Sequence, residues 1–480
     1  MAVLDDLEPR EVWKWFEEVL RIPRPSGEEE RIADFIANYA TERGLQWRRD
    51  ELNNVLVRKN GSGDAAGHPS IALQAHVDIV PEKTENSDHD HSKDPIIPVI
   101  QDGWVTSPET TLGADNGIGV ALMLAVLDSD SIQHPPLECL FTTDEERGLT
   151  GAAGLDPSWI SSRRLINLDS EDEACFVIGC AGGKDVHLEI PVEASGSSEC
   201  FSLEISGLKG GHSGMEINAQ RGNAIRFIGR MLTALVEKLD CRLAMLEGGT
   251  KRNAIPRSCR AVLSLPREGI DAVKELANRI RQDLEVEYSG IEDSIRFELA
   301  PVSDVLPTVS NEFSAKAAAL LLALPHGVEK MSGRNDELVE TSINLATAEM
   351  STETFRISLS IRSPIASARD ALYSRVSAVA ELAGGTVYSS GDYPGWLPNY
   401  DSPMLKKMME IYKDLYGREP FVEAIHAGLE CGIIGDRTGG MDMISIGPDI
   451  RDVHIPGEKV NIESVGTFWK FFVRLLAKLD

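Results

Sequence analysis

The sequence has few basic residues and no apolar run of the about 20 residues that a membrane-spanning helix needs. Its 480 residues include 48 lysines and arginines against 76 aspartates and glutamates, which gives a formal net charge of −28. Nucleic acids and anionic membranes repel so acidic a chain, so we expect neither as a partner. The first residues show no basic segment followed by an apolar one, so no signal peptide is expected.

The seven cysteines lack the C-x-x-C spacing of a zinc ribbon. An odd number without regular spacing is typical of reduced, buried thiols, and it indicates a cytoplasmic protein. Apolar residues make up 42% of the chain, which is enough to bury sizeable cores. The length predicts two or three domains, and the whole composition favours an acidic enzyme.

Short apolar runs near both ends of the chain each lead into polar side chains. Runs of this kind predict strands that are buried on both faces of an α/β sheet, where ligands gather at the carboxyl edge. The runs cover residues 71–75, 137–141, 165–168 and 443–446, and the polar residues that follow them are His76, Glu146, Asp169 and His454.

The middle of the chain has a different pattern. From Lys184 onward, segments such as FSLEI and FRISLSI alternate apolar and polar residues, which is typical of antiparallel strands with one wet face. Helices are predicted between them over residues 223–239, 270–284, 313–324 and 368–382. We therefore predict an inserted α+β domain over residues 184–390, within an α/β domain formed by residues 1–183 and 391–480.

Asp115 lies in a glycine-rich turn, TLGADNG, just before an apolar helix over residues 118–127. A helix N-cap would explain one acidic residue there, but not the glycines on both sides. Two imidazoles and three carboxylates suit a pair of borderline divalent ions, with zinc first and manganese or cobalt as alternatives. Asp115 is expected to bridge the two ions. The predicted ligands are His76, Asp115, Glu146, Asp169 and His454.

Two further carboxylates fit supporting roles. Asp78, two residues after His76, is expected to accept a hydrogen bond from the imidazole and so fix its tautomer. Glu145, beside Glu146, is expected to take a proton from a metal-bridging water, whose pKa metal binding lowers to about 7. Ordinary solvation is the alternative explanation for the acidic run Asp144-Glu145-Glu146. Elsewhere, Ser26 and Glu29 have the spacing of a capping box, which predicts a helix that begins there.

Eight segments of the chain resemble the M20 metallopeptidase family, and in particular its aminoacyl-histidine (Xaa-His) dipeptidase branch. They extend from His76 to Val460, and several of them are specific to the family. The segments are LQAHVDIV, TLGADNGIG, TTDEERGLTGA, INLDSED, GLKGGHSG, KRNAIPR, HAGLECG and DVHIPGEKV.

The resemblance implies a zinc-peptidase-like catalytic domain, with a central mixed sheet flanked by helices, and an inserted α+β lid domain. It implies that one metal is held by the residues matching His76, Asp115 and Asp169, and the other by those matching Asp115, Glu146 and His454. It also implies a cis peptide bond between Asp115 and Asn116.

Residues of the insert receive their roles from the same resemblance. His212 would stabilise the oxyanion, although a lone His on a glycine-rich turn is more often structural. Asn253 and Arg362 would hold the substrate, and a surface ion pair is the alternative for Arg362. Glu430 is a candidate for binding the free amine of the substrate, and a carboxylate paired within the fold is an equal alternative.

The sequence thus predicts a metal-dependent dipeptidase that acts on short peptides with a free N-terminus, Xaa-His dipeptides included. An N-acyl-amino-acid deacylase of the same superfamily is the alternative. A dimetal phosphoesterase would call for a more basic pocket, and a metal-stabilised binding protein would not need Glu145. A homodimer formed through the lid is one expectation, and a doubled lid serving a monomer is the other.

Overall fold

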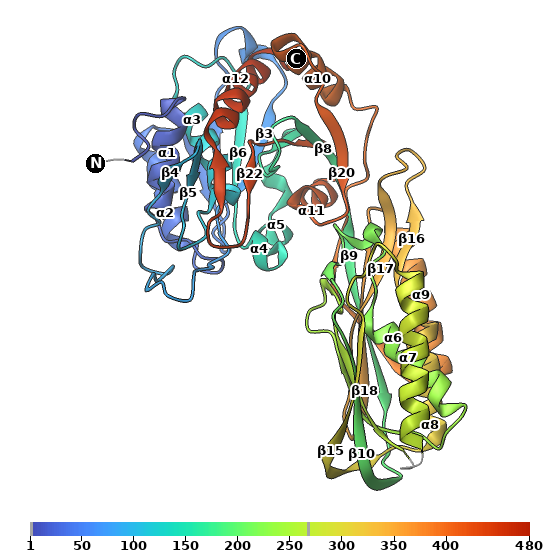
Figure 1. The fold of residues 1–480 in the computed structure, drawn as a ribbon. Helices are drawn as coiled ribbons and strands as arrows, with labels where there is room; N and C mark the ends of the chain where they lie inside the picture. The colour runs from blue at the N-terminus through green and yellow to red at the C-terminus, as the bar shows by residue number, and fades with distance from the viewer. Residues whose placement is uncertain (1–2, 266–268) are drawn as a thin grey trace. The chain divides into compact units, whose positions relative to one another are not determined.

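The computed structural model describes residues 3–265 and 269–480, which form two compact units (Figure 1). Unit 1 comprises the residues up to Cys180, Trp396–Ala424 and Leu429–Asp480. Unit 2 comprises Ala181–Gly395 and Ile425–Gly428. The insert predicted over residues 184–390 lies inside unit 2. The short return of residues 425–428 to this unit was not predicted.

Unit 1 is built on a mixed sheet with the strand order β1-β2-β6-β3-β7-β21-β8-β20. Four neighbours at its centre, β6, β3, β7 and β21, run parallel, whereas β1, β2 and β8 pair antiparallel with their neighbours. The central strands are apolar and buried, as expected of a parallel sheet covered on both faces. The predicted fold class is confirmed.

The helices and strands of unit 1 have the following bounds. They are α1 (Arg10–Leu20), α2 (Glu30–Glu42), β1 (Gln46–Arg49), β2 (Val55–Lys59), β3 (Ile71–His76), β4 (Val99–Gln101), β5 (Trp104–Thr106), α3 (Ala114–Asp128), β6 (Leu137–Thr142), α4 (Glu145–Gly148), α5 (Thr150–Gly154), β7 (Arg164–Asn167), β8 (Cys175–Cys180), α10 (Pro403–Tyr416), β20 (Phe421–Ile425), α11 (Glu430–Arg437), β21 (Asp442–Ser445), β22 (Ile450–Arg451), β23 (Lys459–Asn461) and α12 (Ile462–Lys478).

Helices complete the core of unit 1. The apolar α3 packs against β3 and α1, and α10 packs against α12. In this core Phe176 stacks on Phe471, with ring centroids 5.4 Å apart. All seven cysteines of the chain are buried and free, as the sequence predicted. Among the described residues, no helix is long and apolar enough to cross a membrane.

A small four-stranded sheet, β22-β23-β5-β4, also belongs to unit 1. Its β22 and β23 form a hairpin whose loop carries His454 and Glu458. Because β23 also pairs with β5, this loop is held close to the segment that leads into the Asp115 turn. At the end of β8, Cys180 and Trp396 form an isolated antiparallel bridge, with both N···O distances at 2.9 Å.

Unit 2 contains an antiparallel sheet of nine strands among its described residues, in the order β15-β10-β14-β12-β17-β18-β9-β19, with β16 paired to β17. Figure 1 shows α6, α7, α8 and α9 along one face of this sheet. Apolar side chains of the strands and helices form a second core. The opposite face carries polar residues such as Glu204 and Arg260 beside a small apolar cluster around Val262, which explains the alternation seen in the sequence.

The elements of unit 2 follow in chain order. They are β9 (Gly182–Pro191), β10 (Gly196–Ser206), β11 (Gly211–His212), α6 (Ala224–Val236), β12 (Arg242–Gly248), β13 (Ala254–Ile255), β14 (Cys259–Ser264), α7 (Ile270–Glu287), β15 (Arg296–Thr308), α8 (Asn311–Ala323), β16 (Gly327–Met331), β17 (Val339–Met350), β18 (Thr354–Ser363), α9 (Ala366–Leu382) and β19 (Thr386–Tyr393).

Candidate functional site

The structure brings the five predicted metal ligands together in unit 1. His76 ends β3, Asp169 follows β7, and Glu146 lies in α4, just after β6. Because these three strands are parallel neighbours, their carboxyl ends meet at one edge of the sheet. Asp115 reaches this edge from the first turn of α3, and His454 reaches it from the β22–β23 loop. The peptide bond between Asp115 and Asn116 is cis, as predicted.

The ligand atoms form two triads that share Asp115. The Nε2 atom of His76 lies 3.0 Å from Oδ1 of Asp115 and 3.2 Å from Oδ1 of Asp169. The Nε2 atom of His454 lies 3.2 Å from Oδ2 of Asp115 and 2.9 Å from Oε1 of Glu146. Each carboxylate oxygen of Asp115 therefore faces a different histidine, which is the geometry of a bridging ligand.

This donor set fits a pair of divalent ions. The atoms of each triad lie within 4.8 Å of one another. Oδ1 of Asp169 is buried, and Nε2 of His76, 3.2 Å away, is hydrogen-bonded to Asp115 instead, so no described residue donates a well-aligned hydrogen bond to this oxygen. The side chains of Glu146 and Asp169 are each only 6% exposed, so water compensates little of their charge. Imidazole nitrogens and carboxylate oxygens together suit zinc, manganese or cobalt.

The charges of the site shift the pKa values of its residues. Burial, together with Asp115 and Glu146, raises the pKa of Asp169 to about 6 against the opposing effect of His76. Burial and the charge of Asp115 also raise the pKa of Glu146. Burial lowers the pKa of His454, but its bonds to Asp115 and Glu146 outweigh this and raise it to about 11. Such a concentration of negative charge calls for cations.

Asp78 connects the two strand ends that carry ligands. Its fully buried carboxylate lies 3.4 Å from Nδ1 of His76, and its backbone carbonyl lies 3.2 Å from the same atom. This contact leaves Nε2 directed at Asp115 and Asp169. The carboxylate also accepts hydrogen bonds from the backbone N–H groups of Glu145 at 3.0 Å and Glu146 at 3.3 Å.

Ser26 supports Asp78, and its predicted capping role is wrong. Its hydroxyl donates to Oδ2 of Asp78 at 2.8 Å, whereas α2 begins four residues later with Glu29 at its N-cap. The carboxylate of Glu29 instead accepts from the backbone of Gly27 and Asp144. Ser26 bonds to Asp78 rather than to the helix end because an unpaired buried carboxylate costs more free energy than an unpaired N–H at a helix end.

Two charged residues that the sequence did not single out also hold the site. Arg24 is buried and donates at 2.7 Å to the carbonyls of Val77 and Gly113. Gly113 and Gly117 leave room for this guanidinium, because a Cβ at either position would meet Nη2 of Arg24. These glycines are therefore explained by packing. Their presence in the motif was the available signal, but it did not indicate which side chain occupies the space.

Glu458 is the second of these residues. It is buried, and its carboxylate accepts from the N–H groups of Gly113 at 2.8 Å and Asp115 at 3.1 Å. Burial raises its pKa to about 7, although these backbone bonds oppose the shift. Glu458 thereby connects the loop that carries His454 to the turn that carries Asp115. Its place in the DVHIPGEKV motif was the only signal for this role.

Glu145 and Glu430 are the remaining predicted residues of unit 1. Glu145 can form a third triad with His76 and Glu146, and burial raises its pKa well above the usual range. Glu430 is fully buried and accepts at 2.6 Å from both Gln74 and Thr142. No described residue bonds its other oxygen, and burial raises its pKa to about 8. These contacts match the structural alternative, and amine binding stays a prediction.

In unit 2, hydrogen bonds fix the tautomer of His212. Its Nδ1 accepts from the backbone N–H groups of Met215 at 3.0 Å and Gly214 at 3.3 Å. A nitrogen that accepts is unprotonated, so the neutral ring carries its proton on Nε2. Burial and the charge of Arg362 lower the pKa of His212 and so favour this neutral form. His212 therefore presents a hydrogen-bond donor.

Arg362 lies beside the His212 turn and is buried. Nη1 donates to the hydroxyl of Tyr393 at 3.3 Å. Within residues 3–265 and 269–480, no carboxylate pairs with this guanidinium and its Nε has no partner, so the surface ion pair is excluded. Gly214 packs against Arg362 and the carbonyl of His426. A buried guanidinium without a counter-ion is suited to an anionic group of a ligand.

Two other residues of unit 2 adjoin this cluster. His426, which the sequence did not single out, is buried and lies 2.7 Å from the hydroxyl of Ser342. Burial and Arg362 lower its pKa to about 3, so it is neutral. Asn253 is exposed, and its backbone carbonyl accepts from Ser213 at 2.9 Å, next to His212. Its side-chain role stays a prediction.

A mixed α/β sheet that presents two histidines and three carboxylates as paired triads defines a class of protein, the dinuclear metallohydrolases. A family model described as the M20 peptidase dimerisation domain matches residues 203–292, in unit 2. The cytosol non-specific dipeptidase of Escherichia coli (strain K12) is 40% identical over 483 residues, which cover 100% of this chain and 99% of the relative.

Two further comparisons bear on the fold and the branch. The crystal structure of aminoacylhistidine dipeptidase from Vibrio alginolyticus matches with a TM-score of 0.90 and 41% identity, covering 98% of this chain and 97% of that chain. Acetylornithine deacetylase of Myxococcus xanthus is 28% identical over 266 residues, which cover 51% of this chain and 62% of the relative. The chain belongs to the M20 metallopeptidase family, in its dipeptidase branch, as the sequence predicted.

The role of Glu458 can be tested by replacing it with alanine. Two buried N–H groups then lose their acceptor, and Asp115 loses its support. Outer partners of metal ligands typically contribute 10- to 100-fold to metal affinity, so we expect a loss of about that size. Titration calorimetry with Zn²⁺ or Mn²⁺ measures it, and Glu463→Ala on α12 is the control. Wild-type affinity in Glu458→Ala would show that Asp115 is positioned without it.

Proposed function

We propose that this chain is a metal-dependent dipeptidase that hydrolyses the peptide bond of short peptides with a free N-terminus, Xaa-His dipeptides included. The observation that carries the proposal is the pair of triads sharing Asp115, with the carboxylate of Glu145 close to His76 and Glu146 beside them. The names of the Escherichia coli and Vibrio relatives support the dipeptide substrate. The name of the former supports a cytoplasmic location.

Two divalent ions, zinc first, would be held by the five ligands, with Asp115 between them. When bound, they would activate a water molecule and polarise the carbonyl of the substrate. Asp78 keeps the His76 ring in place and fixes the backbone of Glu145 and Glu146. Arg24 and Glu458 hold the Asp115 turn from two sides. Preorganisation of this kind avoids rearrangement during the reaction.

Glu145 is the proposed general base. Its carboxylate takes a proton from the attacking water and then delivers this proton to the leaving amine. Burial raises the pKa of Glu145, so its carboxylate is a stronger base than an exposed one. The bond from its own N–H to Asp78 fixes the start of α4, from which the side chain projects.

Residues of unit 2 supply the groups that unit 1 lacks. We assign to Nε2–H of His212 a hydrogen bond to the oxygen that becomes negative during attack. Arg362 binds the terminal carboxylate, and Asn253 helps to hold the substrate. Glu430 is assigned to the free amine. These roles require unit 2 of the same chain, or of a second copy in a homodimer, to close over the bound peptide as a lid.

N-acyl-amino-acid deacylation is the second candidate, because the Myxococcus relative is named a deacetylase. A panel of dipeptides with matched N-acetylated versions separates the two activities. We expect hydrolysis of the free dipeptides, loss of activity on chelation, and recovery when Zn²⁺, Mn²⁺ or Co²⁺ is added back. Cleavage of the acetyl group in preference to the peptide bond would overturn the dipeptidase assignment.

Glu145→Gln should keep its metal and lose turnover, because an amide cannot accept the proton of the attacking water. General bases typically contribute 10²- to 10⁴-fold, so a fall in kcat of about a hundredfold or more is expected. Metal content is measured beside activity, and the exposed Glu51→Gln serves as the control. If Glu145→Gln turned over substrate at a near-normal rate, another group would have to be the base.

His212→Ala should lower kcat about 10²- to 10³-fold without loss of metal, as expected for removal of one oxyanion donor. Arg362→Ala should mainly raise KM, if the guanidinium holds the carboxylate equally in the ground and transition states. Steady-state kinetics on one dipeptide tests both variants, and His187→Ala, in β9 of the same unit, is the control. A wild-type kcat in His212→Ala would return this residue to a structural role.

A further inference from the structure

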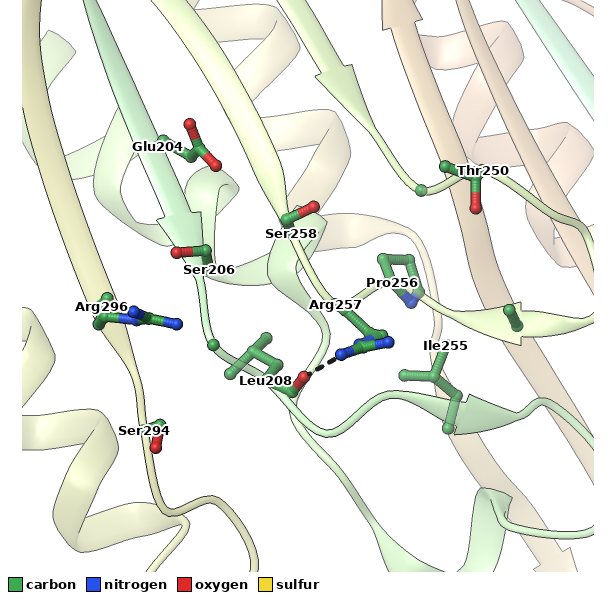
Figure 2. A pocket seen from close by; sticks show the side chains of 13 residues that line it. Glu204, Ser206, Leu208, Thr250, Ile255, Pro256, Arg257, Ser258, Ser294 and Arg296 are labelled. Atoms are coloured by element: carbon green, nitrogen blue, oxygen red, sulfur yellow. Dashed lines mark hydrogen bonds between the residues drawn. The ribbon is translucent and has the colours of Figure 1, made fainter. Parts of the chain in front are cut away.

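A cavity of about 610 Å³ lies wholly within unit 2 (Figure 2). It is located where β10 ends and β14 and β15 begin, and one side is formed by β13 and the residues that follow it. Sites for small molecules typically measure about 300–1,000 Å³, so the cavity is of a suitable size. None of the residues assigned to peptide hydrolysis lines it.

Two guanidinium groups face this cavity. Figure 2 shows Arg257 and Arg296 pointing toward each other across the segment that follows β10. Arg257 donates to the carbonyl of Leu208 at 3.4 Å, which is a long bond. Considering only the described part of the chain, neither arginine has a carboxylate partner.

Two other arginines of this unit are neutralised by carboxylates. Arg230 in the same unit forms a two-pronged pair with Glu287, with both distances at 2.7 Å, and Arg221 pairs with Glu216 at 2.6 Å. Acidic residues outnumber basic ones by 76 to 48 in the whole chain, so partners are plentiful. Arg257 and Arg296 are exposed and have no such partner among the described residues, so both remain available to an anion from outside the chain.

Hydroxyl groups extend this donor set. Ser206, Ser258, Ser294 and Thr250 line the cavity, and none of their hydroxyls is hydrogen-bonded to another described residue. Guanidinium groups can only donate, and hydroxyls can donate as well. A carboxylate has two oxygens for them, whereas a phosphate monoester has three terminal ones. The number of donors thus favours phosphate over carboxylate.

Glycines shape the wall from which the arginines project. A Cβ at Gly207 would collide with the carbonyl of Ser294 and would lie 3.2 Å from Nε of Arg296. A Cβ at Gly210 would collide with the side chain of Arg257. Both glycines have positive φ angles, +85° and +66°, so the chain turns here in a way that other residues rarely adopt. The two glycines therefore leave the space that the side chains of Arg257 and Arg296 occupy.

We infer that this cavity binds a small phosphate monoester. Arg257 and Arg296 would hold the phosphate from two sides, with hydroxyl donors on its remaining oxygens. Glu204 also lines the cavity, and its carboxylate would repel a second anionic group. The organic part of the ligand should therefore carry hydroxyl or amino donors toward Glu204. A sugar phosphate has this combination, and free phosphate shares only its anionic end.

The test is titration calorimetry of the full, metal-loaded chain with ribose 5-phosphate, inorganic phosphate and acetate. We expect ribose 5-phosphate to bind, inorganic phosphate to bind more weakly, and acetate to bind weakest. Arg257→Gln and Arg296→Gln should each weaken binding by about tenfold to a hundredfold, because each removes a charged hydrogen-bond donor. Arg230→Gln is the matched control and should bind like the wild-type protein.

Unfolding curves show whether each variant is folded. If an arginine variant does not fold, Ser206→Ala is tested in its place, because it removes only a hydroxyl. Ser206→Ala should weaken the binding of ribose 5-phosphate by a smaller factor than the arginine variants. Phosphate that binds equally well to both arginine variants would occupy another site, such as the metal centre, and would overturn the proposal. Equal binding of acetate, or no binding of ribose 5-phosphate up to about 10 mM, a concentration well above ordinary ligand affinities, would also overturn it.

Discussion

The candidate metal centre depends above all on the hydrogen bonds of one buried carboxylate, that of Asp78. It contacts the ring of His76 at the end of β3 and accepts from the backbone of Glu145 and Glu146 after β6. A buried carboxylate is costly unless its oxygens are satisfied, so these bonds fix both strand ends at once. His76 and Glu146, two of the predicted ligands, and the proposed base Glu145 thus share a single support.

The fold separates the required chemistry between two units. Unit 1 gathers anionic and imidazole ligands at a sheet edge, where cations are needed to balance them. Unit 2 carries the neutral donor His212 and the cation Arg362, held together through Gly214. Among the described residues, the candidate metal ligands lie in unit 1 and Arg362 lies in unit 2, so the proposed binding of a peptide with two charged ends draws on residues of both units.

Much of this could be predicted, because the ligands follow buried strands and the motif glycines mark close packing. His76, Glu146 and Asp169 were found since parallel strands end at a common edge. Arg24 and Glu458 were missed because their partners are backbone groups distant in sequence, which no local pattern specifies. Ser26 was assigned to a helix cap because its actual partner, the carboxylate of Asp78, is also distant in sequence. The return of residues 425–428 to unit 2 depends on tertiary pairing, which periodicity cannot indicate.

The bridge between Cys180 and Trp396 has a consequence for how such a chain arises. Its two hydrogen bonds, both 2.9 Å long, hold together the points where the chain leaves and re-enters unit 1. The Cα atoms of residues paired in this way lie about 5.5 Å apart, a gap that a tight turn can close. A whole domain inserted into a short hairpin at this point therefore leaves the sheet of unit 1 intact. An exchange of unit 2 at this junction would also have to replace residues 425–428, which belong to the same unit.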